Sequence, residues 1–353
     1  MLEHSADPAP HADAATRQLL ARHEAWWGGR GLLVSRVPSA PLGDLWLPLA
    51  DGTLAHEDLD LRPDLLDADR LAGPALSPGP LERDGDRLRT AAAYARVPWV
   101  EAILGCPIRA SILGGAMRAH AFIDDWARWP GLAHTRRDEW LAALVTQVDL
   151  LVARSGGRYA VTQTLMRGPV DLAEAALGPA MLALSLYDRP ADLARFLEEA
   201  TALFLEVLAA QWARIPALAG GTVNPFGVWA PGRSVRTQCD ASAILSPRQY
   251  QEGFLPWDVE ISRAVPYSLI HLHSGSLHTV PALLAVEAPR AIQVTLDPEP
   301  SGPPVGRLVG TFRQILAHKP LIVDGYLTDD QVGELLRALP HGGLYIAARA
   351  TPD

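Results

Sequence analysis

The stretch YSLIHLHSGSLHTVPALLAVEAPRAIQVTL, residues 267–296, contains a strand, a helix and a second strand in succession. Residues 267–272 form a short apolar run typical of a buried strand, and Ser274-Gly275 marks a turn. Apolar residues at helical spacing follow over 277–286, and 291–296 is again a short apolar run. Short apolar strands that alternate with helices pair in parallel, because each helix returns the chain to the end of the sheet where the previous strand began. The stretch therefore predicts an α/β fold with a parallel sheet.

The same alternation extends over most of the chain. Strand–helix units are predicted at 236–265, 267–286, 291–318 and 320–339, with a last strand at 343–349. Upstream, strands are predicted at 108–115 and 158–165, and helices at 137–156, 171–186 and 190–215. This count favours a (β/α)8 TIM barrel over residues 95–353. A doubly wound open sheet is the alternative, and the lack of Gly-x-Gly-x-x-Gly after any strand argues against its dinucleotide-binding form.

Residues 1–94 differ from the rest of the chain in composition. The first fifteen or so residues have the character of a loose tail, and residues 36–88 are dense in Pro, Asp and Gly. We expect residues 1–94 to form an irregular N-terminal extension packed on the barrel, not a separate domain.

The composition of the 353 residues is that of a globular protein, with 48% apolar and 20% charged residues. The net charge of −9 argues against a nucleic-acid partner and against binding to an anionic membrane. Two cysteines provide neither a disulfide framework nor an all-cysteine zinc site. Three glutamates interrupt the most apolar predicted helix, residues 196–212, and the N-terminus lacks a basic segment followed by an apolar one. We therefore expect a cytoplasmic protein with no membrane span.

Three histidines, His271, His273 and His278, fall within the eight positions 271–278. Side chains two apart on a strand share a face, so His271 and His273 point the same way at a strand end, where barrel enzymes build their sites. His278 belongs to the first turn of the next helix. Neutral imidazole binds Zn, Fe, Co or Ni, with Asp240, Cys239 or His278 as a third ligand. The alternatives are a metal-free polar pair that orients substrate, and histidines with a structural role.

Other polar residues end predicted strands and are candidates for the same site. Cys239-Asp240 ends one strand, and a carboxylate there is a metal ligand, a general base or the partner of a histidine, or else it caps the following loop. Arg167 follows the strand at 158–165 and either binds an anionic substrate or holds a loop carboxylate. The remaining candidates are Asp324 and Tyr326 at the end of a further strand, Gln293 and Asp297 beside them, and the arginines Arg109, Arg233 and Arg236.

Five phrases carry a family resemblance. They are VPWVEAILGCPI (97–108), MRGPVDLAEAALG (166–178), LYDRPADLARFLEEAT (186–201), QCDASAILSPRQYQEGFLPW (238–257) and LIHLHSG (269–275). In this order they resemble the uroporphyrinogen decarboxylase superfamily, from about Trp99 to Ile346. The resemblance implies a (β/α)8 barrel and one of two chemistries. These are cofactor-free decarboxylation of uroporphyrinogen and zinc-dependent transfer of methyl groups between corrinoid proteins and thiols.

Two departures from the patterns of that superfamily narrow these expectations. The decarboxylases carry an arginine-rich phrase near the N-terminus that holds substrate carboxylates, and TRQLLARHEAWWGGRG (16–31) does not match it. The methyltransferases use His-x-Cys on a strand and a second Cys near the last strand, whereas this chain has His271-Leu272-His273 and no cysteine after Cys239. We therefore expect a histidine-based site, and we do not expect uroporphyrinogen to be the substrate.

The leading hypothesis is metal-assisted methyl transfer by a methyltransferase or demethylase, because a coordinated thiol becomes a thiolate at neutral pH. Zinc or another divalent metal is the expected cofactor, with no metal as the alternative. A small molecule is the expected substrate and a corrinoid protein the expected partner. A cofactor-free decarboxylase or related lyase acting on a small carboxylated substrate is the second hypothesis, and a non-catalytic binding barrel is the third. The assigned residues are His271, His273 and Cys239 for the metal, Asp240, Arg167, Tyr326 and Asp324 for catalysis, and His278, Gln293 and Arg236 for substrate binding.

Overall fold

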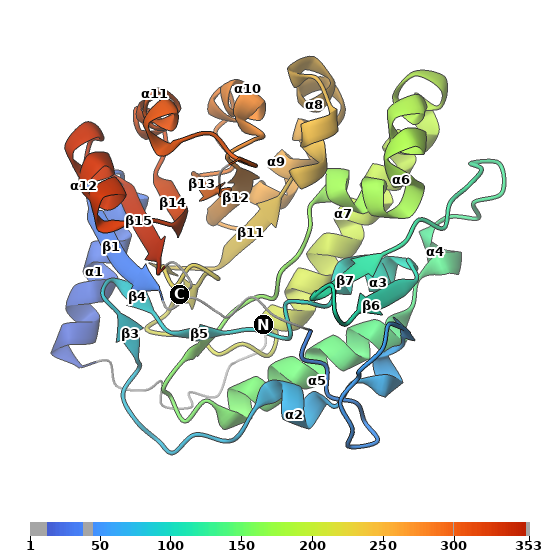
Figure 1. The fold of residues 1–353 in the computed structure, drawn as a ribbon, viewed down its shortest axis with the longest axis horizontal. Coiled ribbons are helices and arrows are strands. Elements are labelled where there is room, and N and C mark those ends of the chain that lie inside the picture. Colours follow the sequence, from blue (N-terminus) through green and yellow to red (C-terminus); the bar gives the residue numbers. More distant parts are fainter. Residues whose placement is uncertain (1–12, 38–44, 299, 351–353) are drawn as a thin grey trace, which may run out of the picture.

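Six parallel strands form the main sheet of the computed structural model, which describes residues 13–37, 45–298 and 300–350 (Figure 1). Their order is β1-β15-β14-β13-β12-β11, and all neighbouring pairs are parallel. The prediction of an α/β fold with a parallel sheet is confirmed. Residues 1–12, where a loose tail was expected, lie outside the described residues. The strands are β1 (Leu32–Val37), β11 (Ser234–Gln238), β12 (Tyr267–His273), β13 (Ala291–Leu296), β14 (Leu321–Tyr326) and β15 (Leu344–Arg349).

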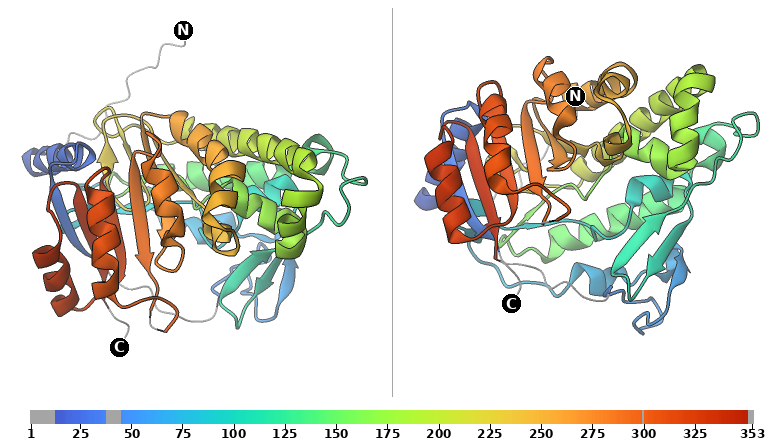
Figure 2. Two further views of the ribbon diagram at one scale, coloured as in Figure 1. Left: turned by 90° about the horizontal axis from the view of Figure 1, so that it is seen from above. Right: turned by 45° about the horizontal axis from the view of Figure 1, so that its top comes forward.

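Helices connect these strands in the predicted alternation. Figure 1 shows them along the outer side of the sheet, and Figure 2 shows the same layer from two further directions. Ser246 and Thr328 each form a capping box with the glutamine three residues later, so the starts of two helices follow directly from the sequence. The elements are η2 (Asp240–Ile244), α8 (Pro247–Gly253) and α9 (Leu255–Arg263) after β11, η3 (Leu277–Thr279) and α10 (Val280–Leu284) after β12, α11 (Val305–Leu316) after β13, and α12 (Asp329–Ala338) after β14.

A separate pair of short parallel strands, β5 (Thr90–Ala91) and β8 (Ala160–Val161), lies beside the main sheet. The side chain of Gln163 connects this pair to β11. Its Oε1 accepts a hydrogen bond from the backbone N–H of Arg236, and its Nε2 donates one to the carbonyl oxygen of Arg236, each at 2.8 Å. On the opposite flank, the Asp86 carboxylate accepts a hydrogen bond from the backbone N–H of Val34 at 2.9 Å. Among the described residues, parallel backbone pairing therefore comprises one sheet of six strands and one of two. Gln163 links the pair to β11, and Asp86, in the turn between β3 (Arg83–Asp84) and β4 (Arg87–Leu88), links that hairpin to β1.

The long helices α5 (Asp138–Arg154), α6 (Pro169–Asp188) and α7 (Pro190–Trp212) lie next to β8, near the short helix α3 (Trp99–Leu104). Within the described residues, α6 is the one helix that is long and apolar enough to cross a membrane by length and composition, and half of its apolar window is buried inside the protein. It also bends, since Gly178 has a φ of 75° and Pro179 begins a second segment. The bend leaves the carbonyl oxygen of Ala176 free to accept hydrogen bonds from two loop N–H groups. Thus α6 has the burial of a core helix.

The region before residue 94 contributes to both parallel sheets, because β1 pairs with β15 and β5 pairs with β8. The strand predicted at 108–115 is present over Ile108–Ser111 but belongs to a separate antiparallel sheet, so it is not a strand of the parallel sheet. That sheet contains β2 (Leu59–Leu61), β6 (Ile108–Ser111) and β7 (Ala116–Ala119). The remaining elements are α1 (Ala14–Trp27), η1 (Pro63–Leu65), α2 (Ala68–Ala72), β3 (Arg83–Asp84), β4 (Arg87–Leu88), α4 (Leu132–Thr135), β9 (Thr222–Val223) and β10 (Trp229–Ala230).

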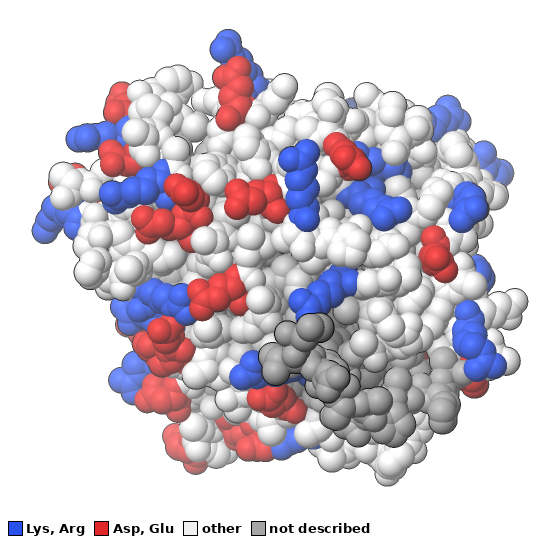
Figure 3. Space-filling model, turned by 180° about the vertical axis from the view of Figure 1, so that it is seen from behind, with Lys and Arg blue, Asp and Glu red and all other residues white. Residues whose placement is uncertain are grey.

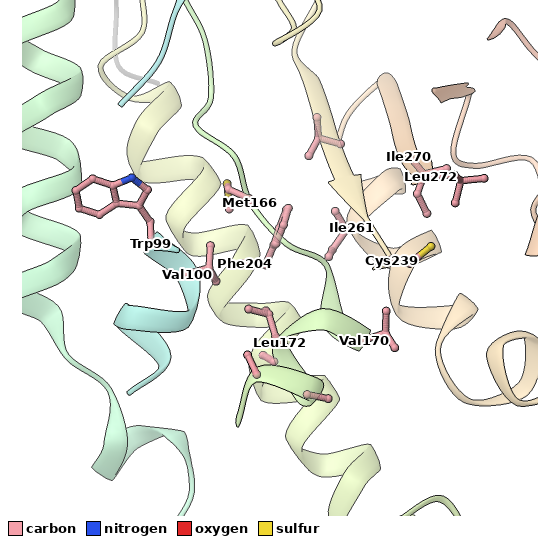
Figure 4. Close-up of a cluster of buried hydrophobic side chains, with 14 of the residues drawn as sticks. Trp99, Val100, Met166, Val170, Leu172, Phe204, Cys239, Ile261, Ile270 and Leu272 are labelled. Carbon is pink, nitrogen blue, oxygen red and sulfur yellow. The ribbon is translucent and has the colours of Figure 1, made fainter. Parts of the chain in front are cut away.

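The two faces of the main sheet bury different residues. On the outer face, alternate residues such as Ile270 and Leu272 pack against the helices in the larger apolar cluster (Figure 4). On the inner face, the N-terminal ends of the strands are apolar, and Leu269 contacts a second cluster that includes Trp26 and Trp27 of α1. Two residues further along β12, β13 and β14 the inner face becomes polar, with His271, Gln293 and Asp324. Because parallel strands end at one edge, these polar side chains collect at the C-terminal edge of the sheet.

Candidate metal centre

Three side chains converge at the C-terminal edge of β11 and β12. Asp240 lies two residues after the end of β11, at the start of η2. His271 and His273 point from the inner face of β12, where Gln238 is paired in register with His271. One ligand atom from each of Asp240, His271 and His273 lies within 4.8 Å of the others. The Nε2 atoms of His271 and His273 are 3.7 Å and 3.9 Å from the two carboxylate oxygens of Asp240. This group could hold a metal ion.

The proton of His271 is fixed by its neighbour on β13. The His271 Nδ1 atom contacts Oε1 of Gln293, and an amide oxygen only accepts, so Nδ1 is the donor. Gln293 is itself oriented by a hydrogen bond from its Nε2 to Oγ1 of Thr295 at 2.9 Å. Burial, reinforced by the charge of Arg236, holds the pKa of His271 well below its usual value. His271 is therefore neutral, and its Nε2 lone pair is free to bind a cation beside Asp240.

The orientation of His273 is fixed by a carboxylate. His273 Nδ1 lies 2.6 Å from Oδ1 of Asp297, whose second oxygen accepts a hydrogen bond from Oγ of Ser274 at 2.9 Å. The Ser274 hydroxyl also accepts from the backbone N–H of Asp297 at 3.0 Å, so the carboxylate is held from two sides. A carboxylate that binds the far nitrogen of an imidazole is the usual support of a metal-binding histidine. His273 therefore also presents Nε2 toward Asp240.

The carboxylate of Asp240 has one satisfied oxygen and one open oxygen. Its Oδ2 accepts a hydrogen bond from Nε2 of Gln238 at 2.8 Å, and Gln238 in turn accepts one from the guanidinium of Arg236. Its Oδ1 is buried and has no hydrogen-bond partner among the residues that the structure describes. Burial raises the pKa of Asp240, and the nearby charges of His273 and Arg236 oppose that rise. A cation bound at Oδ1 would supply the missing partner and favour the ionised form.

The donor set fits a divalent transition metal. Two imidazole nitrogens and one carboxylate oxygen are ligands that zinc and iron(II) accept, and three protein ligands leave coordination positions for substrate. Gln293 and Asp297 provide the supporting hydrogen bonds that such histidines require.

Cys239, which was predicted to bind the metal, and His278, which was predicted as a third ligand or a substrate contact, lie outside this group. Cys239 precedes Asp240, so its side chain points to the opposite side and lies among apolar residues with Ile261 and Ile270 (Figure 4). Burial raises the pKa of the Cys239 thiol well above its usual value, which disfavours the thiolate that a metal needs. His278 Nε2 contacts the carbonyl oxygen of Ser242 at 3.1 Å, because the 3-10 turn carries it toward η2.

Some of the remaining predicted residues lie near the metal-binding group, and others lie away from it. Asp324 is buried and forms a two-pronged ion pair with Arg349, which lies opposite Tyr326 in the register of β14 and β15. Arg167 places Nε 3.3 Å from Oε1 of the buried Glu101. The charges of Arg167 and Arg236 act on Asp240, so both arginines lie near the group. By contrast, Arg109 pairs with Asp60 at 3.6 Å on the antiparallel sheet, and Arg233 stacks over Trp212 at 5.5 Å.

Several residues near the site were not predicted. Asp171, in the first turn of α6, accepts a hydrogen bond from the backbone N–H of Ala241 at 2.7 Å, and burial together with the charge of Asp240 raises its pKa to about 7. Asp258 on α9 accepts a hydrogen bond from the Tyr250 hydroxyl at 2.8 Å, and burial raises its pKa to about 8. Glu101 and Asp258 each interrupt an apolar phrase, VPWVEAILG and FLPWDVE, which is the sequence signal that could have found them.

Comparison with known proteins supports the fold. No family model matches the chain, and no curated protein does. Among solved structures, a methyltransferase from Methanosarcina mazei is similar, with a TM-score of 0.51 and 14% sequence identity, over 95% of this chain and 94% of that one. At this identity the similarity concerns the fold alone, and it extends over nearly the whole of both chains.

Proposed function

We propose that the chain is a metal-dependent methyltransferase or demethylase whose divalent metal is bound by Asp240, His271 and His273. The observation that carries the proposal is the convergence of three ligand atoms within 4.8 Å, one of them an open, buried carboxylate oxygen. The fold similarity to a methyltransferase supports the reaction class. We also propose that β5 and β8 complete an eight-stranded barrel with the main sheet, since Gln163 joins the pair to β11, and Asp86 joins β1 to the β3–β4 hairpin that leads into β5.

The residues of the chain have distinct roles in this proposal. His271 and His273 contribute Nε2 lone pairs whose direction Gln293 and Asp297 determine, and Asp240 contributes negative charge. A divalent metal held by Asp240, His271 and His273 would supply Lewis acidity, which would make an acceptor thiol easier to deprotonate near neutral pH. In the transfer, the bond from the methyl carbon to the acceptor sulfur forms while the bond from that carbon to its donor breaks.

The partners of this reaction are part of the proposal. The acceptor is a small molecule, and a corrinoid protein is the methyl donor. Uroporphyrinogen is not the substrate, because the missing N-terminal arginine phrase leaves several of its carboxylates without ionic partners. Turnover of uroporphyrinogen to a decarboxylated product by the purified protein would contradict this statement.

Metal analysis of protein purified without a histidine tag tests the proposal. We expect about one divalent ion per chain, loss of that ion in His271→Ala/His273→Ala, and retention in the control His278→Ala, which alters a histidine outside the group. Metal-loaded protein should also melt at a higher temperature than metal-free protein, because the ion binds the native state. Protein that binds no metal on titration and shows no melting shift would contradict it.

A cofactor-free decarboxylase acting on a carboxylated substrate is the second candidate. The observation in its favour is the presence of Arg167 and Arg236 close enough to act electrostatically on Asp240. It becomes the better description if the metal-free protein releases carbon dioxide from a carboxylated substrate and added metal leaves that rate unchanged.

A further inference from the structure

Arg167 and Arg349 share an unusual arrangement. The side chain of each is about one third exposed, 36% and 38%, whereas the paired carboxylates of Glu101 and Asp324 are only 2% and 4% exposed. Other arginine pairs, such as Arg248 with Glu252, have both partners exposed, and charges of both signs are interspersed over the face shown in Figure 3. A buried carboxylate orients the guanidinium and offsets its charge while the outer side of the arginine stays accessible.

Both arginines have guanidinium N–H groups that their paired carboxylates do not use. Arg349 uses Nε and Nη2 for Asp324 and also has the Tyr326 side chain as a hydrogen-bond partner, so about two of its five N–H groups are left over. Arg167 approaches Glu101 through Nε, and neither of its Nη groups has a hydrogen-bond partner in residues 13–37, 45–298 or 300–350. A guanidinium presents planar N–H groups that match the oxygens of a carboxylate or a similar anion. Each arginine therefore has unused N–H groups suited to an anion.

Both arginines also face the metal centre. Arg349 lies opposite Tyr326 in the strand register and pairs with the inner-face residue Asp324. Asp324 is paired in register with Thr295 of β13, whose hydroxyl accepts a hydrogen bond from Gln293, the residue that orients His271. Arg167 precedes Gly168, whose backbone N–H donates to the carbonyl oxygen of Gln238 at 3.1 Å, and the side chain of Gln238 donates to Asp240. The two arginines thus reach one site from two elements, the loop after β8 and the end of β15.

We propose that Arg167 and Arg349 each bind one anionic group of the substrate, which is therefore a small dianion of the dicarboxylate type. The inference rests on the proposed function for the position of the reacting group, at Asp240, His271 and His273. It does not depend on which reaction takes place there. Two arginines on separate elements each present their own donors, so two anionic groups satisfy both without breaking the pairs to Glu101 and Asp324.

Calorimetric titration with malonate, succinate and glutarate tests this inference, at ionic strength matched with NaCl and with uncharged succinamide as a negative control. We expect saturable binding of at least one of the three diacids and none of succinamide. Arg167→Gln and Arg349→Lys should each weaken binding about tenfold, because each removes a charge-assisted contact or its planar geometry. Arg109→Gln is the matched control, since Arg109 lies on the antiparallel sheet, and it should bind as the wild type does.

Asp324→Asn/Arg349→Gln removes both charges of the buried pair together, so it tests the contact without leaving an unpaired buried carboxylate. This variant should remain folded by circular dichroism and bind diacids as weakly as Arg349→Lys. Absence of saturable binding by all three diacids would overturn the inference, and so would unchanged affinity in both single variants. Diacid binding that persists in metal-free His271→Ala/His273→Ala supports the arginine site whatever becomes of the metal proposal.

Discussion

On β12, β13 and β14, the inner face of the main sheet changes from apolar to polar within two residues. Leu269, Ala291 and Ile322 are fully buried in an apolar cluster, whereas His271 and Gln293, two positions further on, are almost as buried but polar. Burial of an apolar side chain stabilises the fold, while burial of a polar one avoids a cost only where it is hydrogen-bonded. The apolar end therefore supplies the stability that lets the polar end keep an open carboxylate oxygen on Asp240.

The largest expected effect comes from the apolar end. Leu269→Ala should lower the free energy of unfolding by about 3 kcal/mol, because it leaves a cavity in the second apolar cluster. Metal content of the folded protein should not change. Urea unfolding and metal analysis of the same preparation measure both quantities, with Thr295→Ala at the polar end as the comparison of smaller cost. Loss of metal from folded Leu269→Ala would show that the two ends are not independent.

A buried histidine at the apolar end makes this region sensitive to acid. His23 contacts the carbonyl oxygen of Asp86 and accepts from the backbone N–H of Trp229, and burial lowers its pKa from 6.5 to about 4. The unfolded chain therefore binds a proton that the native state excludes, so stability falls as the pH drops from 6.5 toward 4. The expected loss is about 3 kcal/mol.

Unfolding of His23→Gln at pH 7 and pH 4.5 provides the check, since an amide can still donate one hydrogen bond and accept the other. The variant should lose less stability than the wild type between these two values. An equal loss in both proteins would assign the acid sensitivity to other groups.

Asp258, on α9 behind the sheet, tests the opposite dependence of stability on pH. Its native pKa of about 8 is above the usual 3.8, so the native state retains a proton that the unfolded chain releases, and stability falls as the pH rises between these values. Asp258→Asn removes this titration while its oxygen can still accept from Tyr250. We expect the stability of the variant relative to the wild type to rise by about 2 kcal/mol between pH 6.5 and pH 9. A variant less stable than the wild type at pH 9 would mean that the native protein stabilises the ionised carboxylate of Asp258.

A smaller effect is expected from the support of His273. Asp297→Asn keeps the shape of the side chain but removes its charge, and it should weaken metal binding about tenfold, or about 1.4 kcal/mol, with little change in melting of the metal-free protein. Competition with a chelator of known affinity measures the change. Unchanged affinity would mean that Asp297 has no influence on the metal site.

The sequence predicted the regular half of this fold well and the irregular half poorly. The strand predicted at 291–296 matches β13 residue for residue, and the strand predicted at 267–272 falls one residue short of β12, because each is an apolar run of typical strand length bounded by turn residues or by glycine and proline. The strand predicted at 158–165 pairs over two residues only, since the side chain of Gln163 replaces backbone pairing to β11. The periodicity of apolar residues does not reveal where a side chain replaces backbone pairing between two strands.

The convergence of His271, His273 and Asp240 followed from strand alternation and from the shared edge of parallel strands. Cys239 was assigned with Asp240 because the two are adjacent in sequence, although adjacent residues leaving a strand point to opposite sides. Glu101 and Arg349 were missed because their partners, Arg167 and Asp324, lie far away in the sequence. Such pairs become visible only when the strands are placed side by side.

X-ray absorption spectroscopy of zinc-loaded, untagged protein tests the central claim most directly. Two imidazoles and one carboxylate predict a first shell of nitrogen and oxygen at about 2.0–2.1 Å, with imidazole scattering and no sulfur. The signal should disappear in His271→Ala/His273→Ala, and Cys239→Ser should leave it unchanged. A sulfur scatterer at about 2.3 Å, or a protein that takes up no zinc, would contradict the metal centre formed by Asp240, His271 and His273.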